Sequence, residues 1–145
     1  MIATNAFTRN LLIVDDNEAL TQLLAWEFEE FGYTVCRAAD CQQAAELAGA
    51  ISFDFALVDY HLPDGDGRSL SRRLKQLSPR LHVVKMSADR AAATAQEKDV
   101  AIMVAFVEKP VPTARIHHIF SVRAAAPVRT PGHPGLRQEA PARAF

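Results

Sequence analysis

The sequence predicts an α/β protein with a doubly wound, five-stranded parallel sheet and flanking helices. Short apolar runs, typical of strands buried on both faces, alternate along the chain with segments of helical apolar spacing. In such a chain the carboxyl ends of the strands meet at one edge of the sheet, where ligands bind. Five polar residues lie at or just after predicted strand ends: Asp15, Asp16, Asp59, Ser87 and Lys109.

The first two β/α units are the clearest. Leu11–Val14 is a continuous apolar run and predicts a strand, and Asn17–Phe31 has helical apolar spacing. Tyr33–Ala38 predicts the second strand. The second helix is expected from its cap at Asp40 to about Ala48, because a glutamine three residues after the aspartate indicates a capping box. Glycines after each helix supply the stops, Gly32 and Gly49.

The next two units are separated by a loop rich in turn residues. We predict a strand over Phe53–Asp59, a loop over Leu62–Gly67 and a third helix over Ser69–Leu77. Leu81–Met86 predicts the fourth strand. The alanine-rich segment Arg90–Lys98 predicts a helix with little apolar face.

The last unit begins within Val100–Val107, which contains the fifth strand. Lys109 ends this strand, and the bond to Pro110 is a candidate for the cis form. Thr113 caps a final helix whose narrow apolar stripe consists of Ile116, Ile119 and Phe120. We therefore expect an N-terminal extension over 1–9, one domain over 10–124, and a flexible tail rich in proline, alanine and arginine over 125–145.

Composition narrows the class of protein. A chain of 145 residues with 49% hydrophobic and 23% charged residues is typical of one soluble domain. No apolar run approaches the ~20 residues of a membrane-spanning helix, and the first ten residues lack a signal-peptide core. Cys36 and Cys41 lack the spacing of a metal site or a disulfide framework. We expect a cytoplasmic protein without a membrane partner or an appended DNA-binding domain.

The polar residues at the strand ends indicate a divalent-cation and phosphoryl site. At about 4 Å and an effective dielectric near 20, two carboxylates repel by roughly 4 kcal/mol, which a hard cation such as Mg²⁺ offsets. Alone, Asp15 and Asp16 fit equally well a simple helix cap. Asp59 favours the cation site, because an aspartate directly after a buried strand can attack phosphorus. Lys109 and Ser87 can then hold phosphoryl oxygens.

With this set of residues the chain resembles response-regulator receiver domains, in particular single-domain chemotaxis-type regulators, over roughly Asn10–Ala124. The resemblance implies a (βα)5 flavodoxin-like fold and a two-component phosphorelay. It implies that Asp59 is the phosphoacceptor and that Mg²⁺ is the cofactor. The other roles it implies are Mg²⁺ binding by Asp15, Asp16, Asp59 and the backbone carbonyl of His61, phosphoryl binding by Ser87 and Lys109, and conformational switching by Ser87 and Phe106.

The implied function is signalling, with enzymatic activity limited to self-phosphorylation and self-dephosphorylation. The phosphoryl group would come from a sensor histidine kinase or a histidine phosphotransfer protein. Phosphorylation would change the face made by the fourth helix, fifth strand and fifth helix, which would bind a downstream protein target not named by the sequence. A homodimer through the same face is compatible with this reading.

Two alternatives remain open for the function. One is a receiver-like scaffold that binds its partners without phosphorylation. The other is a small phosphohydrolase with an aspartate nucleophile, although such enzymes carry a second aspartate where this chain has His61. A calcium-binding loop over residues 62–73 is rejected, since Leu62 and Arg73 occupy its ligand positions.

Three details bear on the face made by the fourth helix, fifth strand and fifth helix. Phe106 is either the switch aromatic or an ordinary core residue of the fifth strand. Lys85 stands where an apolar residue is expected, and it either extends outward or places a charge on that face. The connection Glu97–Met103 lacks the glycine that receivers often carry there.

The side chain of His61 is expected to point to solvent at the site entrance.

Overall fold

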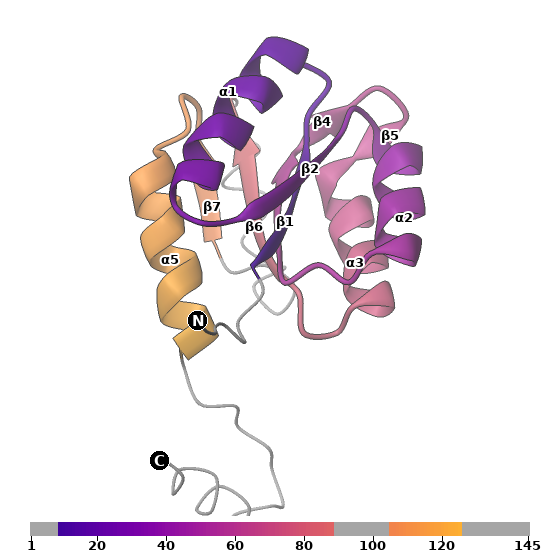
Figure 1. Ribbon diagram of the computed structural model, residues 1–145. Coiled ribbons are helices and arrows are strands. Elements are labelled where there is room, and N and C mark those ends of the chain that lie inside the picture. Colours follow the sequence, from indigo (N-terminus) through magenta and orange to yellow (C-terminus); the bar gives the residue numbers. More distant parts are fainter. Residues whose placement is uncertain (1–8, 89–104, 126–145) are drawn as a thin grey trace, which may run out of the picture.

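A computed structural model describes residues 9–88 and 105–125 of the chain. Its centre is a five-stranded sheet in the order β2-β1-β3-β6-β7, in which all neighbouring strands are parallel (Figure 1). The strands are β1 (Asn10–Val14), β2 (Thr34–Ala38), β3 (Phe55–Asp59), β6 (His82–Ser87) and β7 (Ala105–Glu108). The predicted doubly wound parallel sheet is confirmed.

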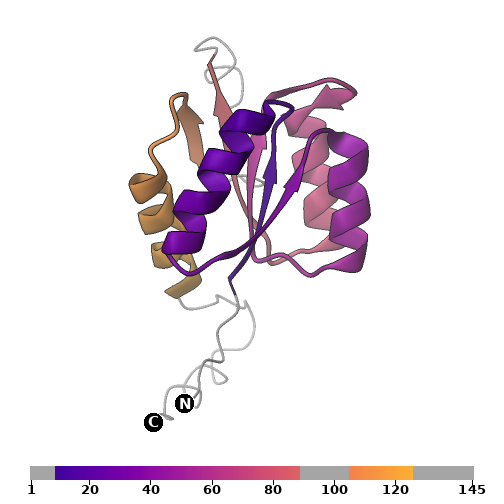
Figure 2. The ribbon, with the colours of Figure 1, turned by 45° about the horizontal axis from the view of Figure 1, so that its top comes forward.

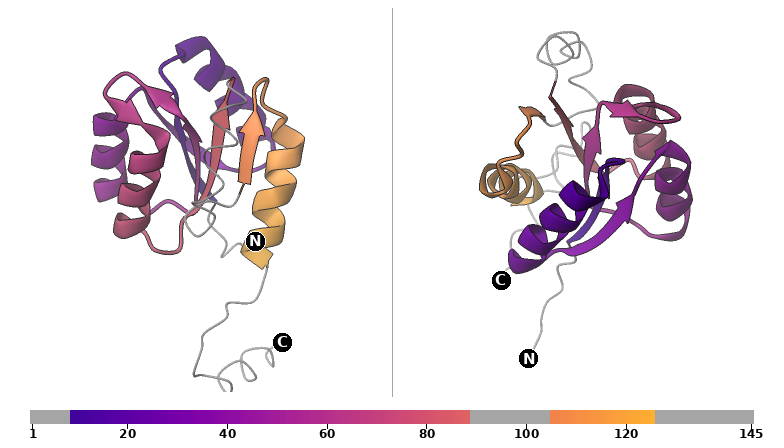
Figure 3. Two further views of the ribbon diagram at one scale, coloured as in Figure 1. Left: turned by 180° about the vertical axis from the view of Figure 1, so that it is seen from behind. Right: turned by 90° about the horizontal axis from the view of Figure 1, so that it is seen from above.

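The helices lie on both faces of this sheet. Helices α1 (Glu18–Glu30) and α5 (Thr113–Ala125) cover one face and contact each other. Helices α2 (Cys41–Ala50) and α3 (Gly67–Leu77) cover the other face, as seen from behind and from above in Figure 3. A short antiparallel hairpin of β4 (His61–Leu62) and β5 (Gly65–Asp66) connects β3 to α3.

Some predictions concern parts of the chain outside the described residues. The helix over Arg90–Lys98, the connection Glu97–Met103 and the first part of the Val100–Val107 segment belong to this group. The expected extension over 1–9 and tail over 125–145 lie outside as well, apart from Arg9 and Ala125. These predictions stay untested.

Alternation of side chains along the strands divides the core in two. The part under α1 and α5 contains four aromatic rings, and we call it the aromatic core: Leu11, Ile13, Leu24, Phe28, Tyr33, Phe55, Leu57, Val84, Met86, Val107, Ile116 and Phe120. The part under α2 and α3 contains one phenylalanine among smaller side chains, and we call it the aliphatic core: Leu12, Val14, Ala38, Ala44, Phe53, Ala56, Val58, Leu62, Leu70, Leu74, Leu81 and Val83.

Side-chain caps set the helix starts. The side chains of Asn17, Asp40 and Asp66 accept hydrogen bonds from the backbone N–H groups of the third residues of α1, α2 and α3. The predicted start of α3 at Ser69 is therefore wrong by two residues, because Asp66 is the cap. In the expected capping box at α2, the Gln43 side chain reaches the N–H of Ala39, one residue before the cap.

Two helix ends differ in kind. Gly32 has a φ of 99° directly after the C-cap of α1, which confirms it as the stop. Gly49 instead lies within α2, and the helix continues to Ala50 with Ile51 as its C-cap. The predicted end of α2 at Ala48 is wrong, because the N–H of Ile51 donates to the carbonyl of Leu47 and extends the helix.

Several side chains among the described residues depart from simple burial rules. Lys85 is 0% exposed, so of the two alternatives the outward extension is wrong, and its side chain lies inside the domain. On α1, Trp26 is 61% and Leu23 is 49% exposed.

Within the described residues no helix has the length and apolar character needed to cross a membrane.

Candidate metal centre

Three carboxylates meet at the carboxyl edge of the sheet, where the order of the strands reverses between β1 and β3. Asp15 and Asp16 directly follow β1, and Asp59 is the last residue of β3. One oxygen from each carboxylate lies within 4.8 Å of the others, and we call these three residues the acidic site. Asp15 and Asp59 are buried, whereas Asp16 is exposed. The predicted convergence of these side chains is confirmed.

Lys109 connects two of the three carboxylates. Its Nζ lies 2.7 Å from Oδ2 of Asp15 and 3.5 Å from Oδ1 of Asp59. The backbone N–H of Lys109 donates to the carbonyl of Ser87 at 2.9 Å, so β7 continues its contact with β6 to this residue. The Lys109–Pro110 bond is cis, as the sequence suggested. The second oxygen of Asp15, Oδ1, accepts the backbone N–H of Asn17 at 2.9 Å.

The electrostatics of the site favour a cation. Burial, and then the neighbouring charge of Asp15, raise the pKa of Asp59 above its ordinary value, although Lys109 and the His61 backbone N–H act in the opposite direction. Burial alone would lower the pKa of Lys109, but its hydrogen bond with Asp15 and the charges of both carboxylates outweigh burial and raise it. Three carboxylates thus face one ammonium. An all-oxygen donor set with excess negative charge fits a hard divalent cation such as Mg²⁺.

The segment after Asp59 folds back tightly on the end of β3. The backbone N–H of Tyr60 donates to the carbonyl of Met86, and the N–H of Gly67 donates to the carbonyl of Tyr60 at 2.7 Å. A Cβ atom at Gly67 would collide with the backbone carbonyl oxygen of Asp59, so only glycine fits without a backbone shift. His61 is exposed, as expected, and its ring contacts that of Tyr60 edge to face.

Ser87 and Phe106 lie on β6 and β7, the two strands that follow β3 in the order of the sheet. Ser87 is the last residue of β6 and is buried at the same edge of the sheet as the acidic site. Phe106 lies in β7 opposite Lys85 in the strand register. The side chain of Phe106 lies outside the described part of the structure, so its switch role stays a prediction.

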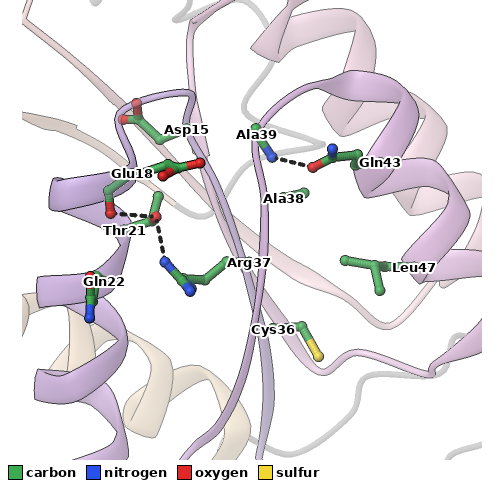
Figure 4. A pocket seen from close by; sticks show the side chains of 10 residues that line it. All are labelled: Asp15, Glu18, Thr21, Gln22, Cys36, Arg37, Ala38, Ala39, Gln43 and Leu47. Carbon is green, nitrogen blue, oxygen red and sulfur yellow. Dashed lines mark hydrogen bonds between the residues drawn. The ribbon is translucent and has the colours of Figure 1, made fainter.

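A polar pocket of about 530 Å³ adjoins the acidic site at Asp15. Figure 4 shows Asp15 and Glu18 on the α1 side and Ala39 and Gln43 on the α2 side, with Arg37 of β2 between them. Arg37 Nη1 donates to Oγ1 of Thr21 at 3.4 Å. The pocket therefore extends the polar edge of the sheet from the acidic site toward β2.

Two contributors to this region were not singled out from the sequence. The turn-rich composition of residues 62–67 predicts only a loop at Gly67, although an Asp-Gly pair before a helix indicates a cap followed by a close backbone approach. The same composition predicts only a loop at Asp64, yet its carboxylate accepts the backbone N–H groups of Cys41 and Gln42. No local sequence signal identifies these partners, which lie more than twenty residues away.

Comparison with known proteins gives the family. The family model described as "Response regulator receiver domain" matches residues 11–121. The sensor protein TorS of Escherichia coli (strain K12) is 31% identical over 103 residues, which cover 70% of this chain and 11% of TorS. The response regulator protein PilR of Pseudomonas aeruginosa is 31% identical over 120 residues, covering 83% of this chain and 26% of PilR. The chain thus spans about a quarter of PilR and about a tenth of TorS.

A solved structure gives the same result. The fold is similar to that of a response regulator protein from Burkholderia pseudomallei, crystallised with a phosphorylated aspartic acid, a calcium ion and citrate, with a TM-score of 0.68 and 32% identity. The similarity covers 80% of this chain and 71% of that one. Because the family match extends from β1 to α5, this chain belongs to the response regulator receiver domain family.

Proposed function

We propose that this chain accepts a phosphoryl group on Asp59 from a sensor histidine kinase or a histidine phosphotransfer protein. The observation that carries the proposal is the contact of Lys109 with both Asp15 and Asp59. With Asp16 beside them, one site contains a nucleophile, an ammonium group that can bind a phosphoryl oxygen, and carboxylates that can bind a metal. The phosphorylated aspartic acid of the Burkholderia pseudomallei protein supports it. The resemblance to sensor proteins such as TorS supports a kinase partner.

The transfer begins at a carboxylate oxygen of Asp59. This oxygen attacks the phosphorus of a phosphohistidine, a P–O bond forms as the P–N bond breaks, and the electron pair of that bond stays with the imidazole nitrogen. Lys109, whose Nζ is 3.5 Å from Asp59 Oδ1, balances charge on a phosphoryl oxygen. Ser87 offers a hydroxyl donor from the end of β6.

We further propose Mg²⁺ as the cofactor, held by Asp15, Asp16, Asp59 and the backbone carbonyl of His61. When bound, this ion neutralises charge on the carboxylates and on the phosphoryl group. The oxygen-only donor set of the acidic site supports a hard cation. The calcium ion of the Burkholderia pseudomallei structure supports a divalent ion of this type.

The output of the domain is proposed to be the face that contains β7 and α5. Phosphorylation would draw the Ser87 hydroxyl toward the phosphoryl group, and Phe106 would follow, which would shift the balance between two conformations. A downstream protein, or a second copy of this chain, would bind the changed face. We propose that residues 10–124 form this signalling unit and that it acts in the cytoplasm.

The test is the mass of the intact protein after incubation with acetyl phosphate, with and without Mg²⁺. We expect one phosphoryl adduct that requires Mg²⁺ and is absent from Asp59→Asn. Asp54→Asn is the matched control, because Asp54 precedes β3 and accepts the backbone N–H of Asn10 far from the acidic site; this variant should retain the adduct. A wild-type protein that gains no adduct, while a known receiver does, would contradict the proposal and favour the unphosphorylated scaffold.

A further inference from the structure

Asp64 joins the loop after the proposed phosphoacceptor to a different helix. It is an exposed residue at the turn of the β4–β5 hairpin, yet both of its carboxylate oxygens are used. Oδ1 accepts the backbone N–H of Cys41 at 2.7 Å, and Oδ2 accepts that of Gln42 at 3.1 Å. These N–H groups belong to the first turn of α2, where a helix has no partner for them.

The electrostatics agree with a firm contact. The hydrogen bond from Cys41 is the main reason that the pKa of Asp64 lies below its ordinary value, and the bond from Gln42 adds to it. The carboxylate is therefore ionised at neutral pH, and it lies at the positive end of the α2 dipole. In turn, burial and then the hydrogen bond and charge of Asp64 raise the pKa of the Cys41 thiol to about 11.

The capping of α2 itself does not depend on Asp64 alone. Asp40, the residue before α2, accepts the backbone N–H of Gln43 through Oδ1 at 2.8 Å. The two aspartates thus bind different N–H groups of the same helix turn. Asp40 is local to α2, whereas Asp64 comes from the hairpin, so of these two aspartates it is Asp64 that links the two elements.

The hairpin that Asp64 holds also carries backbone groups of the acidic site. His61, the first residue of β4, donates its backbone N–H to the carboxylate of Asp59. In the hairpin register His61 pairs with Asp66, and Leu62 pairs with Gly65. Asp64 lies at the turn between these pairs, so a contact that fixes the turn also fixes the position of His61. Figure 2 shows the hairpin and the first turn of α2 at the same end of the molecule.

We propose that Asp64 is a positioning residue for the metal: by bonding the β4–β5 hairpin to the first turn of α2, it holds the backbone of His61 at the acidic site. This inference rests on the proposed function, in which the His61 carbonyl is a Mg²⁺ ligand. Removing a residue that orients a metal ligand commonly lowers the affinity for the metal 10–100-fold. Because Asp64 acts through a hairpin that Leu62 and Gly67 also hold, we expect a loss of about tenfold, at the lower end of that range.

The experiment compares Mg²⁺ affinity in three variants by titration calorimetry of the full chain. Asp64→Ala should raise the Mg²⁺ dissociation constant about tenfold, and Asp64→Asn, which keeps one acceptor oxygen, should raise it less. Asp40→Ala is the matched control, because it removes a capping bond from the same helix turn and leaves the hairpin contact intact. Its melting temperature should fall while its dissociation constant stays within about twofold of wild type.

Amide hydrogen exchange is the second measurement, and it requires no metal. The backbone amides of residues 61–66 should exchange faster in Asp64→Ala and Asp64→Asn than in the wild type. In Asp40→Ala their exchange rates should be unchanged. Equal dissociation constants in wild type and both Asp64 variants would overturn the inference, and so would an equal loss in Asp40→Ala. A wild-type protein that binds no Mg²⁺ would overturn the proposed function together with this inference, which separates the two failures.

Discussion

The two faces of the sheet are held together in different ways. Under α1 and α5, ring centroids of neighbouring aromatic residues lie 4.5–6.4 Å apart, with Phe120 contacting Phe28, Tyr33 and Phe55. Under α2 and α3 the side chains are smaller, and carboxylates bind the first turn of each helix. Because aromatic rings bury the most apolar area per residue, we infer that the first face supplies most of the stability and the second sets the geometry of the acidic site.

The strongest test of this division is Phe120→Ala on α5. Phe120 is fully buried among three rings, so its truncation should cost about 3–5 kcal/mol of unfolding free energy. Urea unfolding measures this loss. The folded protein should still bind Mg²⁺ with wild-type affinity. Val122→Ala, at a 52% exposed position two residues further along α5, should cost less than about 0.5 kcal/mol. A large loss of Mg²⁺ affinity in Phe120→Ala would contradict the division.

Gly67→Ala tests the other face. The added Cβ would collide with the carbonyl oxygen of Asp59, so the backbone must move, at a cost of about 1–3 kcal/mol. Mg²⁺ affinity should fall as well, since the moved carbonyl belongs to the proposed phosphoacceptor. Gly49→Ala in α2 is the control, because nothing lies within 4 Å of its added Cβ, and it should stabilise the protein by about 0.5–1 kcal/mol. Unchanged affinity in Gly67→Ala would show that the loop adapts.

Asp59→Asn should stabilise the metal-free protein, by about 1 kcal/mol, because it removes a buried charge next to Asp15. The sign follows from the raised pKa of Asp59, because folding favours the protonated form of this carboxyl group. The stability that protonated Asp59 contributes to the folded state is therefore fully present below the ordinary aspartate pKa. It is lost as pH rises through the higher pKa of the folded state. Melting in EDTA across this range should show the decline in wild type and not in the variant. Asp16→Asn, at an exposed position, should give a smaller gain.

The smallest effect is expected at His117 on α5. Its Nδ1 is hydrogen-bonded to the Tyr33 hydroxyl at 2.9 Å, and its ring stacks on Phe31 at 4.4 Å. Burial, and then the charges of Arg9 and His118, lower the pKa of His117, so folding favours the neutral ring. Its contribution is present above the ordinary histidine pKa of about 6.5 and is lost as pH falls below it.

The measurement is the melting temperature at pH 7 and at pH 5. His117→Gln should reduce the fall in melting temperature between pH 7 and pH 5 by about 1–2 °C. His118→Gln, at an exposed position on the same helix, removes one of the charges that lower the pKa of His117 and should reduce this fall by less. The burial-lowered pKa of His82 gives a decline of the same sign, which remains in both variants. A decline of equal size in wild type and His117→Gln would contradict the prediction.

The sequence predicted the sheet and the convergence of the strand ends because both follow from short-range patterns. Apolar runs such as Leu11–Val14 identify buried strands, and parallel connection then brings Asp15 and Asp59 together. Helix limits were predicted less well, because Asp66 and Ser69 both resemble caps and only packing decides between them. The bonds from Asp64 to α2 and the burial of Lys85 depend on distant parts of the chain, and no local pattern contains them.

Trp26 has a consequence for how this protein can be observed. It is the only tryptophan of the chain and already faces water on α1, so unfolding changes the surroundings of its indole little. Tryptophan emission is therefore a poor signal for denaturation, and circular dichroism is the better choice. The same ring would report a second molecule that covers α1, through a blue shift and reduced quenching by iodide. The domain thus carries an intrinsic fluorescent probe for one of its outer surfaces.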